Sequence, residues 1–283
     1  MPDTFTIAAI QPFEPRSGAD QPQMASTAWK LAEDAAAGGA KLLVFPEYFN
    51  VMGVAPAEAR GNIENTRLQR EAAASFCRDS EVWLLLPLIE KRDNGVFNTA
   101  HLFDTGGQIV HTYDKTHLTI GEKRDYGLTA GDRIDTVDTP LGCIGVMICY
   151  DVYFPQVSQL LALRGAQIIL FPSLQRSDSE ENVMMFNRVR AMDATAYFVR
   201  SSYGQRRGAA FKPGLMHGGS CVVGPDGSVL ANAGHHEGIA AARIDPHTPW
   251  QRQRCGGMPP QPVREFLLED RRPQLYGPIS EGQ

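Results

Sequence analysis

Short apolar runs alternate with stretches of helical periodicity along most of the chain. Runs of roughly four to eight apolar residues that are rich in β-branched side chains are typical of buried strands. Between these runs, apolar residues recur at helical spacing, as in Met24, Ala28 and Leu31, which is typical of an amphipathic helix. We therefore expect buried strands at 5–10, 42–45, 82–89, 143–148 and 167–171, and helices at 24–35, 68–76, beyond Pro155 and at 180–194.

Turn sequences predict hairpins between shorter apolar segments. Asp104-Thr105-Gly106-Gly107 and Gly224-Pro225-Asp226-Gly227 are the clearest of these turns. Alternating strands and helices followed by hairpins predict a mixed α/β sheet with helices outside it, and this pattern occurs twice along the chain. The last part of the chain is rich in Pro, Arg and Gln and lacks regular periodicity. We expect one domain over residues 1–250 and an extended tail over residues 251–283.

Composition and charge favour small molecules or other proteins as partners. The chain has 283 residues, 43% of them hydrophobic, which suffices for one large core. Its net charge of -5 argues against nucleic acid and membrane partners, because both require clustered Lys and Arg. The apolar run at 82–89 is far shorter than the roughly 20 residues that span a bilayer. The odd set of cysteines shows no paired spacing and suits a reducing compartment, so we expect a cytoplasmic protein.

Three side chains with complementary chemistry follow predicted strands. Glu47, Lys115 and Cys149 each stand at or just beyond the end of a strand. Strand ends converge on the ligand crevice of open α/β sheets, so we expect these side chains to meet. A cysteine is a good nucleophile only as the thiolate, and Glu47 would take its proton. Lys115 and the backbone N–H of Tyr150 would stabilise the oxyanion that forms when the sulfur attacks an acyl carbon.

Each of these residues also has a purely structural explanation when it is taken alone. An isolated cysteine at a strand end is more often a small buried hydrophobe than a nucleophile. A lone glutamate often caps a helix, and a lone lysine is usually a solvated charge. His101, His111 and His117 lie near Lys115 in the sequence, but their irregular spacing matches no metal template. We therefore expect no metal site, and we expect His117 to act as a hydrogen-bonding neighbour.

The segments around the three reactive residues resemble a known family. Phe45-Pro46-Glu47, the segment 113–118 and the segment 148–155 resemble, in this order, the three signature segments of the nitrilase superfamily of carbon-nitrogen hydrolases. The resemblance extends to Arg190-Ala191 and to His217-Gly218-Gly219-Ser220. It implies a four-layer α-β-β-α sandwich that forms a homodimer across its helical face, with the C-terminal tail packed on the partner.

The resemblance also implies a role for each site residue. Cys149 would be the nucleophile, Glu47 the general base and Lys115 the residue that stabilises the oxyanion. Glu122, in the polar loop after the lysine, is similar to the family's second glutamate, which positions the substrate and the lysine. The enzyme would cleave a non-peptide C–N bond through a thioester intermediate and release ammonia or an amine, and the chemistry requires no metal or organic cofactor.

Residues near the nucleophile narrow the expected substrate class. Nitrile-hydrolysing members usually follow the cysteine with Trp-Glu, whereas Tyr150-Asp151 resembles the branches that act on amides and carbamoyl compounds. We therefore expect a small linear amide or an N-carbamoyl compound as substrate. Loops carry specificity, and arginine binds carboxylates well. The side chains that we expect at the pocket are Tyr153 and Phe154 and the basic cluster Arg206, Arg207 and Lys212.

Other functions are compatible with the same residues. The aromatic pair would also suit the core, and the basic cluster would also suit a solvated loop. Tyr153 and Gln156 stand where many members carry arginine and glutamate, and Ala194 stands where many carry asparagine. A nitrilase and an acyl transferase are alternatives within the family. A catalytically silent binding module is a further alternative, although such a protein would have no need to retain all three reactive side chains.

Overall fold

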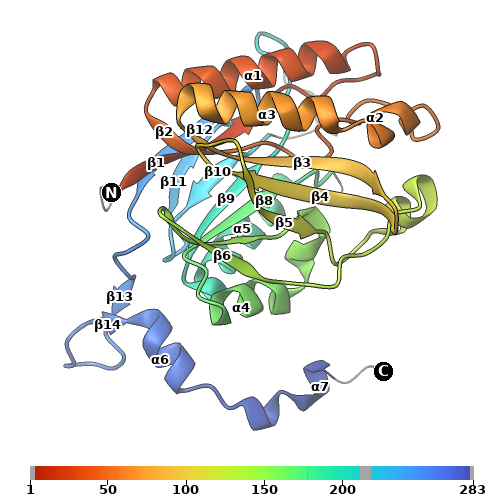
Figure 1. The fold of residues 1–283 in the computed structure, drawn as a ribbon. Coiled ribbons are helices and arrows are strands. Elements are labelled where there is room, and N and C mark those ends of the chain that lie inside the picture. The colour runs from red at the N-terminus through yellow and green to blue at the C-terminus, as the bar shows by residue number, and fades with distance from the viewer. Residues whose placement is uncertain (1–3, 177, 211–217, 281–283) are drawn as a thin grey trace. The chain divides into compact units, whose positions relative to one another are not determined.

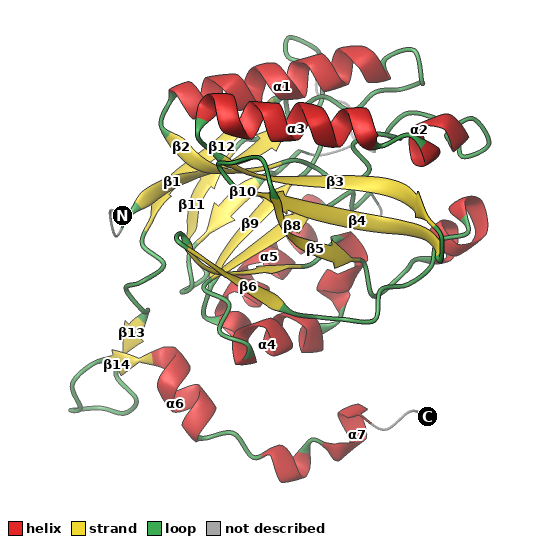
Figure 2. Cartoon of the chain, viewed as in Figure 1, coloured by secondary structure: helices red, strands yellow, loops and turns green. Residues whose placement is uncertain are grey.

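The structure consists of two compact units. The computed structural model describes residues 4–176, 178–210 and 218–280. The first unit is Met1–Pro246 and the second is His247–Gln283. Of the residues singled out in the sequence, Lys212 and His217 lie outside the described ranges. The first unit contains two six-stranded sheets and the helices that cover them (Figure 1 and Figure 2).

The first sheet is mixed, as the strand pattern predicted. The strands β1, β2 and β3 are parallel, whereas β12, β4 and β5 join by antiparallel pairing. Helices α1 (Gln21–Ala37) and α3 (Arg67–Ser80) lie along its outer face, with the short α2 (Arg60–Glu64) beside them (Figure 1). The strand order is β12 (Gly238–Ile244), β1 (Phe5–Gln11), β2 (Ala40–Val44), β3 (Trp83–Arg92), β4 (Gly95–Phe103) and β5 (Ile109–Asp114).

The second sheet repeats this architecture with the later part of the chain. Its parallel centre is formed by β7, β8 and β9, and antiparallel strands complete both sides. Helices α4 (Pro155–Leu163) and α5 (Glu180–Ala194) cover it on the side away from the first sheet (Figure 1). The strand order is β11 (Val229–Asn232), β10 (Cys221–Val223), β9 (Tyr197–Ser201), β8 (Ile168–Pro172), β7 (Gly142–Val146) and β6 (Thr136–Thr139).

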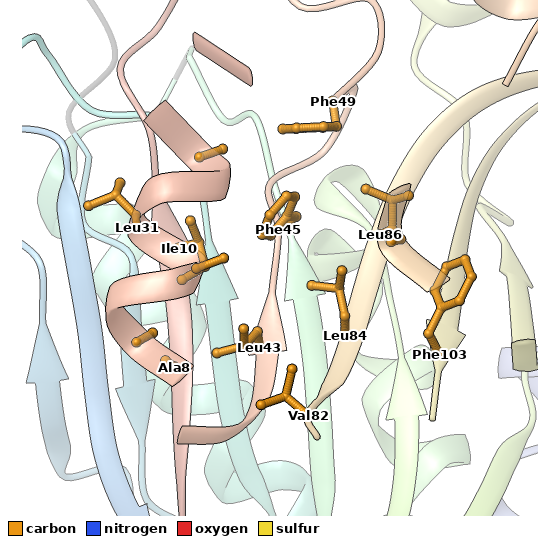
Figure 3. Packing of buried hydrophobic residues seen from close by; sticks show 14 of the residues in the cluster. Ala8, Ile10, Leu31, Leu43, Phe45, Phe49, Val82, Leu84, Leu86 and Phe103 are labelled. Carbon is orange, nitrogen blue, oxygen red and sulfur yellow. The ribbon is translucent and has the colours of Figure 1, made fainter. Parts of the chain in front are cut away.

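Separate hydrophobic clusters hold the layers together. Successive residues of a strand point to opposite faces of a sheet. Ala8 and Ile10 of β1 therefore pack beneath the outer helices (Figure 3), whereas Ile7 and Ala9 of the same strand face the second sheet. A third cluster, which includes Phe198, lies between the second sheet and its helices α4 and α5. The layers are thus helix, sheet, sheet and helix, which confirms the predicted four-layer sandwich.

Over its described residues, the second unit contains only short regular elements. They are β13 (Gln251–Arg252), β14 (Gln261–Pro262), α6 (Val263–Glu269), a 3-10 turn (Pro273–Leu275) and α7 (Gly277–Ser280). Val263 is buried, whereas Leu267, Leu268 and Leu275 are exposed. The sequence shows no periodicity in this segment because each element is too short to repeat an apolar face.

Candidate active site

The ends of strands in both sheets deliver the reactive side chains. Glu47 lies just beyond β2, and Lys115 directly follows β5. Glu122 begins a π-helical turn (Glu122–Tyr126) within the loop that the sequence predicted to be irregular. Cys149 follows β7 and begins a 3-10 turn (Cys149–Tyr153) that leads into α4. The predicted convergence of strand ends is therefore observed.

A buried lysine lies between two carboxylates. Lys115 Nζ donates to Glu47 Oε1 at 2.9 Å and to Glu122 Oε1 at 2.8 Å. The exposed fractions of Lys115, Glu47 and Glu122 are 1%, 0% and 3%. Charge-assisted hydrogen bonds are strong in such a water-poor site, so the ammonium group fixes the relative position of both carboxylates.

Asn98 completes this group, and the sequence interpretation missed it. Its Nδ2 atom donates to Glu47 Oε1 at 2.8 Å and to Glu122 Oε1 at 2.9 Å. Asn98 lies on β4, and its carbonyl accepts a 2.9 Å hydrogen bond from the backbone N–H of Lys115. The available sequence signal was Asn98 itself, a polar residue within an otherwise apolar strand. The sequence alone does not show which neighbouring strand this residue faces.

The nucleophile candidate lies on a strained turn. Cys149 has a φ of 45°, in the left-handed region that non-glycine residues seldom adopt. Tyr48, which follows Glu47, has a φ of 62°. Strained backbone conformations of this kind occur often at functional sites, where the surrounding structure holds them. Cys149 is 9% exposed, and the nearby backbone of Leu174 acts to lower the pKa of its thiol.

One carboxylate connects the cysteine turn to the lysine loop. Asp151 is fully buried, and its Oδ2 atom accepts the backbone N–H of Ile148 at 2.9 Å and the hydroxyl of Tyr113 at 2.8 Å. Its Oδ1 atom accepts the backbone N–H of His117 at 3.0 Å and lies 2.9 Å from the Nδ1 atom of the same residue. The expected role of His117 as a hydrogen-bonding neighbour is therefore confirmed.

Burial and charge set the protonation of the site. Burial raises the pKa of the Cys149 thiol far above its ordinary value, the Glu47 carboxylate raises it further, and Lys115 acts in the opposite direction. Burial likewise raises the pKa of Glu47, against the pull of Lys115. For Lys115, burial would lower the pKa, but the surrounding negative charges outweigh it and raise the pKa. A cationic lysine and a neutral thiol are therefore the resting forms at neutral pH.

Glu47 has one oxygen available for proton transfer. Its Oε1 atom accepts the hydrogen bonds from Lys115 and Asn98. Its Oε2 atom is buried and has no hydrogen-bond partner among the described residues. A general base requires an oxygen that is not already saturated by donors, so this geometry suits Glu47 for that function.

A cavity of about 1210 Å³ adjoins the reactive group. Its lining includes Glu122, Tyr48 and Leu174, and the backbone of Leu174 lies near enough to Cys149 to lower the pKa of its thiol. The cavity exceeds the roughly 300–1,000 Å³ of typical ligand pockets, so it has room for a substrate that extends beyond its amide group. Lining residues from other loops are Phe13, Arg176 and Arg206.

Of the described residues that the sequence predicted at the pocket, one lines the cavity and the others do not. Arg206 lines the cavity, with its guanidinium 3.9 Å from the centre of the Phe13 ring. Arg207 is absent from the described lining, and its guanidinium donates to the backbone carbonyl of Glu237. Tyr153 and Phe154 are also absent from that lining. Tyr153 bonds to Asp178 through its hydroxyl, and Phe154 stacks on His117 with ring centres 3.8 Å apart.

The other two histidines near the lysine lie beside carboxylates. His101 lies 3.2 Å from the carboxylate of Glu90, and His111 lies 3.7 Å from that of Asp135. The described residues contain no cluster of His, Cys, Asp and Glu side chains that would hold a metal ion.

Comparison with known proteins identifies the family of this chain. The carbon-nitrogen hydrolase family model matches residues 6–250. The chain therefore belongs to the carbon-nitrogen hydrolase family, which confirms the family and the enzyme class predicted from the sequence. It is 31% identical over 275 residues to the deaminated glutathione amidase of Homo sapiens, covering 91% of this chain and 80% of the relative. It is 30% identical over 229 residues to the omega-amidase of Homo sapiens, covering 77% and 81%.

Solved structures support the same fold. The NitFhit protein of C. elegans superimposes with a TM-score of 0.78 at 26% identity, covering 96% of this chain and 66% of that chain. An amidase from Nesterenkonia sp. gives a TM-score of 0.75 at 23% identity, covering 97% and 96%. Across the part of the chain that the structure describes, every helix is too short or too polar to traverse a bilayer.

Proposed function

We propose that this carbon-nitrogen hydrolase cleaves a small linear amide or an N-carbamoyl compound through a thioester on Cys149. The observation that carries the proposal is the arrangement of Lys115 between the carboxylates of Glu47 and Glu122, with the cysteine turn held beside them by Asp151. The relatives named above are amidases, which supports amide hydrolysis as the reaction class.

In the first step, the sulfur of Cys149 attacks the carbonyl carbon of the substrate. The Oε2 atom of Glu47 accepts the thiol proton, so a negatively charged sulfur never has to persist in the buried site. The new bond is S–C, and the negative charge moves onto the carbonyl oxygen. Lys115 and the backbone N–H of Tyr150 stabilise that oxyanion. The C–N bond then breaks, and Glu47 returns its proton to the departing ammonia or amine.

In the second step, water hydrolyses the thioester. Glu47, ionised again, removes a proton from water as the oxygen attacks the acyl carbon. The S–C bond breaks, the sulfur recovers the proton from Glu47, and the carboxylic acid leaves. Glu122 does not exchange protons in this scheme. It holds Lys115 through a 2.8 Å hydrogen bond, and its other oxygen accepts the backbone N–H of Thr119 at 2.8 Å.

Arg206 is the proposed contact for a substrate carboxylate. It lines the cavity and is held there by Gln23 at 2.9 Å and by Asp20 at 3.4 Å, so its position is defined before substrate binds. The loop residue Arg176, paired with Glu14, brings a second guanidinium to the same cavity. Acidic residues of the same wall, Glu14 and Asp20, each pair with one of these guanidiniums, so a substrate carboxylate would bind through their remaining N–H donors.

We further propose a cytoplasmic homodimer formed across the helices of the second sheet. Met185, Val189 and Met192 of α5 are exposed, as are Leu160 and Leu163 of α4. Burial of such side chains between two copies removes apolar area from water. The cysteines are all free thiols, which suits a reducing compartment. Light scattering on the purified chain tests the dimer, and Met192→Glu is the variant expected to reduce it to a monomer.

The reaction is tested with a panel of amides, nitriles and N-carbamoyl acids. Ammonia release and intact protein mass are followed for the wild type and for Cys149→Ala, with Cys77→Ala as the matched control. The proposal expects turnover of amides or carbamoyl compounds, an acyl adduct on the wild type, and complete loss only in Cys149→Ala. Turnover by Cys149→Ala would contradict the mechanism. Turnover of nitriles alone, or acyl transfer to added amines without acid formation, would replace the proposed reaction class.

A further inference from the structure

A chain of hydrogen bonds joins the segment after β8 to the cysteine turn. Tyr153, the last residue of that turn, donates through its hydroxyl to Asp178 Oδ2. The same oxygen accepts Gln175 Nε2 at 3.2 Å, and Gln175 Oε1 accepts the hydroxyl of Ser173 at 3.1 Å. Ser173 directly follows β8, and its backbone N–H donates to the carbonyl of Ser201 at 2.9 Å. The chain therefore runs from the second sheet to the residue that closes the cysteine turn.

Residues 173–176, here called the wall segment, also form part of the cavity wall. Leu174 and Arg176 line the cavity. Ser173 and Gln175, which alternate with them, are 0% and 5% exposed and belong to the chain of hydrogen bonds. Every second side chain of the wall segment thus faces the cavity, and the side chains between them fasten it from behind.

Neighbouring strands place the wall segment beside the nucleophile. The strands β7 and β8 are parallel neighbours, with Val146 paired to Leu170. Cys149 and Leu174 follow shortly after these two paired residues, so they leave the same ends of adjacent strands, which lie about 4.8 Å apart. The pKa effect of the Leu174 backbone on the Cys149 thiol agrees with this placement. A shift of the wall segment would therefore change the surroundings of the sulfur.

The ring and the hydroxyl of Tyr153 make separate contacts. The ring packs against Tyr150 and Phe186, with ring centres 5.3 and 5.0 Å apart. The hydroxyl donates to the carboxylate of Asp178, and a hydrogen bond to an ionised acceptor is stronger than one between neutral groups. Burial and this hydrogen bond raise the pKa of Tyr153, so the phenol is a neutral donor at physiological pH. Removing the hydroxyl alone would release Asp178 and leave the packing of the ring in place.

We propose that Tyr153 is a positioning residue that fastens the wall segment to the cysteine turn through Asp178 and Gln175, and thereby sets the shape of the cavity beside the nucleophile. Tyr153 acts at a distance from the substrate, because it is absent from the described lining of the cavity. This inference rests on the proposed function, since it gives Tyr153 a part in binding the amide that Cys149 attacks.

The fastening is tested without substrate by hydrogen–deuterium exchange of the peptide that carries the wall segment. Tyr153→Phe should speed this exchange about tenfold, because a hydrogen bond to a charged group contributes roughly that much to local stability. Gln175→Met breaks the same chain at a second point and should act in the same direction, since its side chain lacks an amide. The matched control is Tyr197→Phe, whose lost hydroxyl contacts the backbone of Asp245. Wild-type exchange in folded Tyr153→Phe would overturn the proposal.

Catalysis is measured with the amide that the wild type hydrolyses. Tyr153→Phe and Gln175→Met should each lower kcat/KM about tenfold, because small displacements around reacting groups are costly. Both variants break one chain, so the double variant should lose no more than either single variant, whereas independent losses would multiply. Tyr197→Phe should keep the wild-type kcat/KM. Thermal unfolding is measured for each variant, and a lowered Tm with wild-type kcat/KM in Tyr153→Phe would show that its contact is merely structural.

The outcomes separate this inference from the proposed function. Turnover by Cys149→Ala would remove the proposed mechanism, but the exchange rates would still decide whether Tyr153 fastens the wall segment. Wild-type kcat/KM in Tyr153→Phe, or multiplied losses in the double variant, would overturn the positioning role and leave the thioester mechanism intact. Faster exchange in both single variants, together with losses of kcat/KM that do not multiply, supports the inference.

Discussion

Lys115 and Asn98 donate to the same two oxygen atoms. Both side chains reach Glu47 Oε1 and Glu122 Oε1, at distances of 2.8 to 2.9 Å. The two donors and the two carboxylates therefore form one polar group of four side chains. These side chains come from separate segments of the chain. Because the positions of the base and of the second glutamate depend on both donors, loss of the neutral donor should disturb catalysis even with Lys115 intact.

Asn98→Ala should reduce kcat by about tenfold to a hundredfold, since small displacements of catalytic groups cost roughly that much. The matched control is Asn50→Ala. Asn50 is also a buried amide, but its side chain bonds to the backbone of Ile89 and Asn62 and, among the described residues, makes no hydrogen bond to Glu47 or Glu122. We expect Asn50→Ala to lower the unfolding temperature while keeping kcat. Equal kcat losses in the two variants would show that Asn98 contributes only to stability.

Asp151→Asn should both destabilise the protein and slow the reaction. The amide group has only one acceptor oxygen, so it cannot accept from the N–H groups of Ile148 and His117 on both sides at once. Breaking a buried charged contact of this kind costs about 3 kcal/mol in the free energy of unfolding. Urea denaturation and steady-state kinetics measure the two effects. Asp138→Asn, at an exposed position of β6, is the control, and a denaturation midpoint for Asp151→Asn equal to that of Asp138→Asn would contradict the assignment.

Arg206→Ala and Arg207→Ala should differ in their effect on substrate binding. Arg206 lines the cavity, whereas the guanidinium of Arg207 bonds to the backbone of Glu237. Loss of a charge-assisted contact is expected to raise KM for anionic amides about tenfold in Arg206→Ala, with little change for neutral amides. Arg207→Ala should leave both KM values near those of the wild type. Equal increases for neutral and anionic amides would exclude a carboxylate contact at Arg206.

Glu90, a buried carboxyl group outside the active site, should make the free energy of unfolding depend on pH in the acid range. Burial raises the pKa of Glu90, but the hydrogen bond to His101 and the charges of Arg70 and Arg92 outweigh it, so the pKa lies below its ordinary value. A carboxyl group whose pKa is lower in the folded state stabilises the protein above its unfolded-state pKa, and that contribution disappears as pH falls through the folded-state pKa. Urea unfolding between pH 6 and about pH 3 measures this loss.

The control for this pH effect is Glu90→Gln, which removes the titrating group. Its free energy of unfolding should be lower than that of the wild type at pH 6, and the difference between the two proteins should shrink as pH falls. The exposed Glu58→Gln should follow the wild-type curve throughout. A constant difference between Glu90→Gln and the wild type across this range would show that protonation of Glu90 does not govern acid stability.

The strands of the sandwich were predictable because apolar runs such as the one containing Leu43 are buried on both faces. The approach of Glu47, Lys115 and Cys149 was predictable because strand ends meet. Asn98 was not, because its role depends on the register between β4 and β5, which the local sequence does not encode. The π-helical turn at Glu122 was also missed, since it is too short to give a periodic signal.

Adjacent residues can have different surroundings for reasons that only the fold reveals. Arg206 and Arg207 look equivalent in the sequence, yet one lines the cavity and the other bonds to the backbone of Glu237. Arg200 falls within a strand predicted from its apolar neighbours, and nothing in that pattern indicates that a guanidinium would be buried there without a salt bridge to any described carboxylate. Pairing of charges is a property of tertiary structure, so it could not be derived from spacing.

The cavity wall and the reactive group come from different kinds of chain segment. Glu47, Lys115 and Cys149 are fixed by strand ends, whereas Phe13 and Arg206 belong to loops. Loops tolerate substitution and insertion far better than core strands do. A change of substrate could therefore arise in the wall by a few loop mutations while proton transfer and nucleophilic attack stay intact. The same division makes this chain a suitable scaffold for selecting new amide specificities in the laboratory.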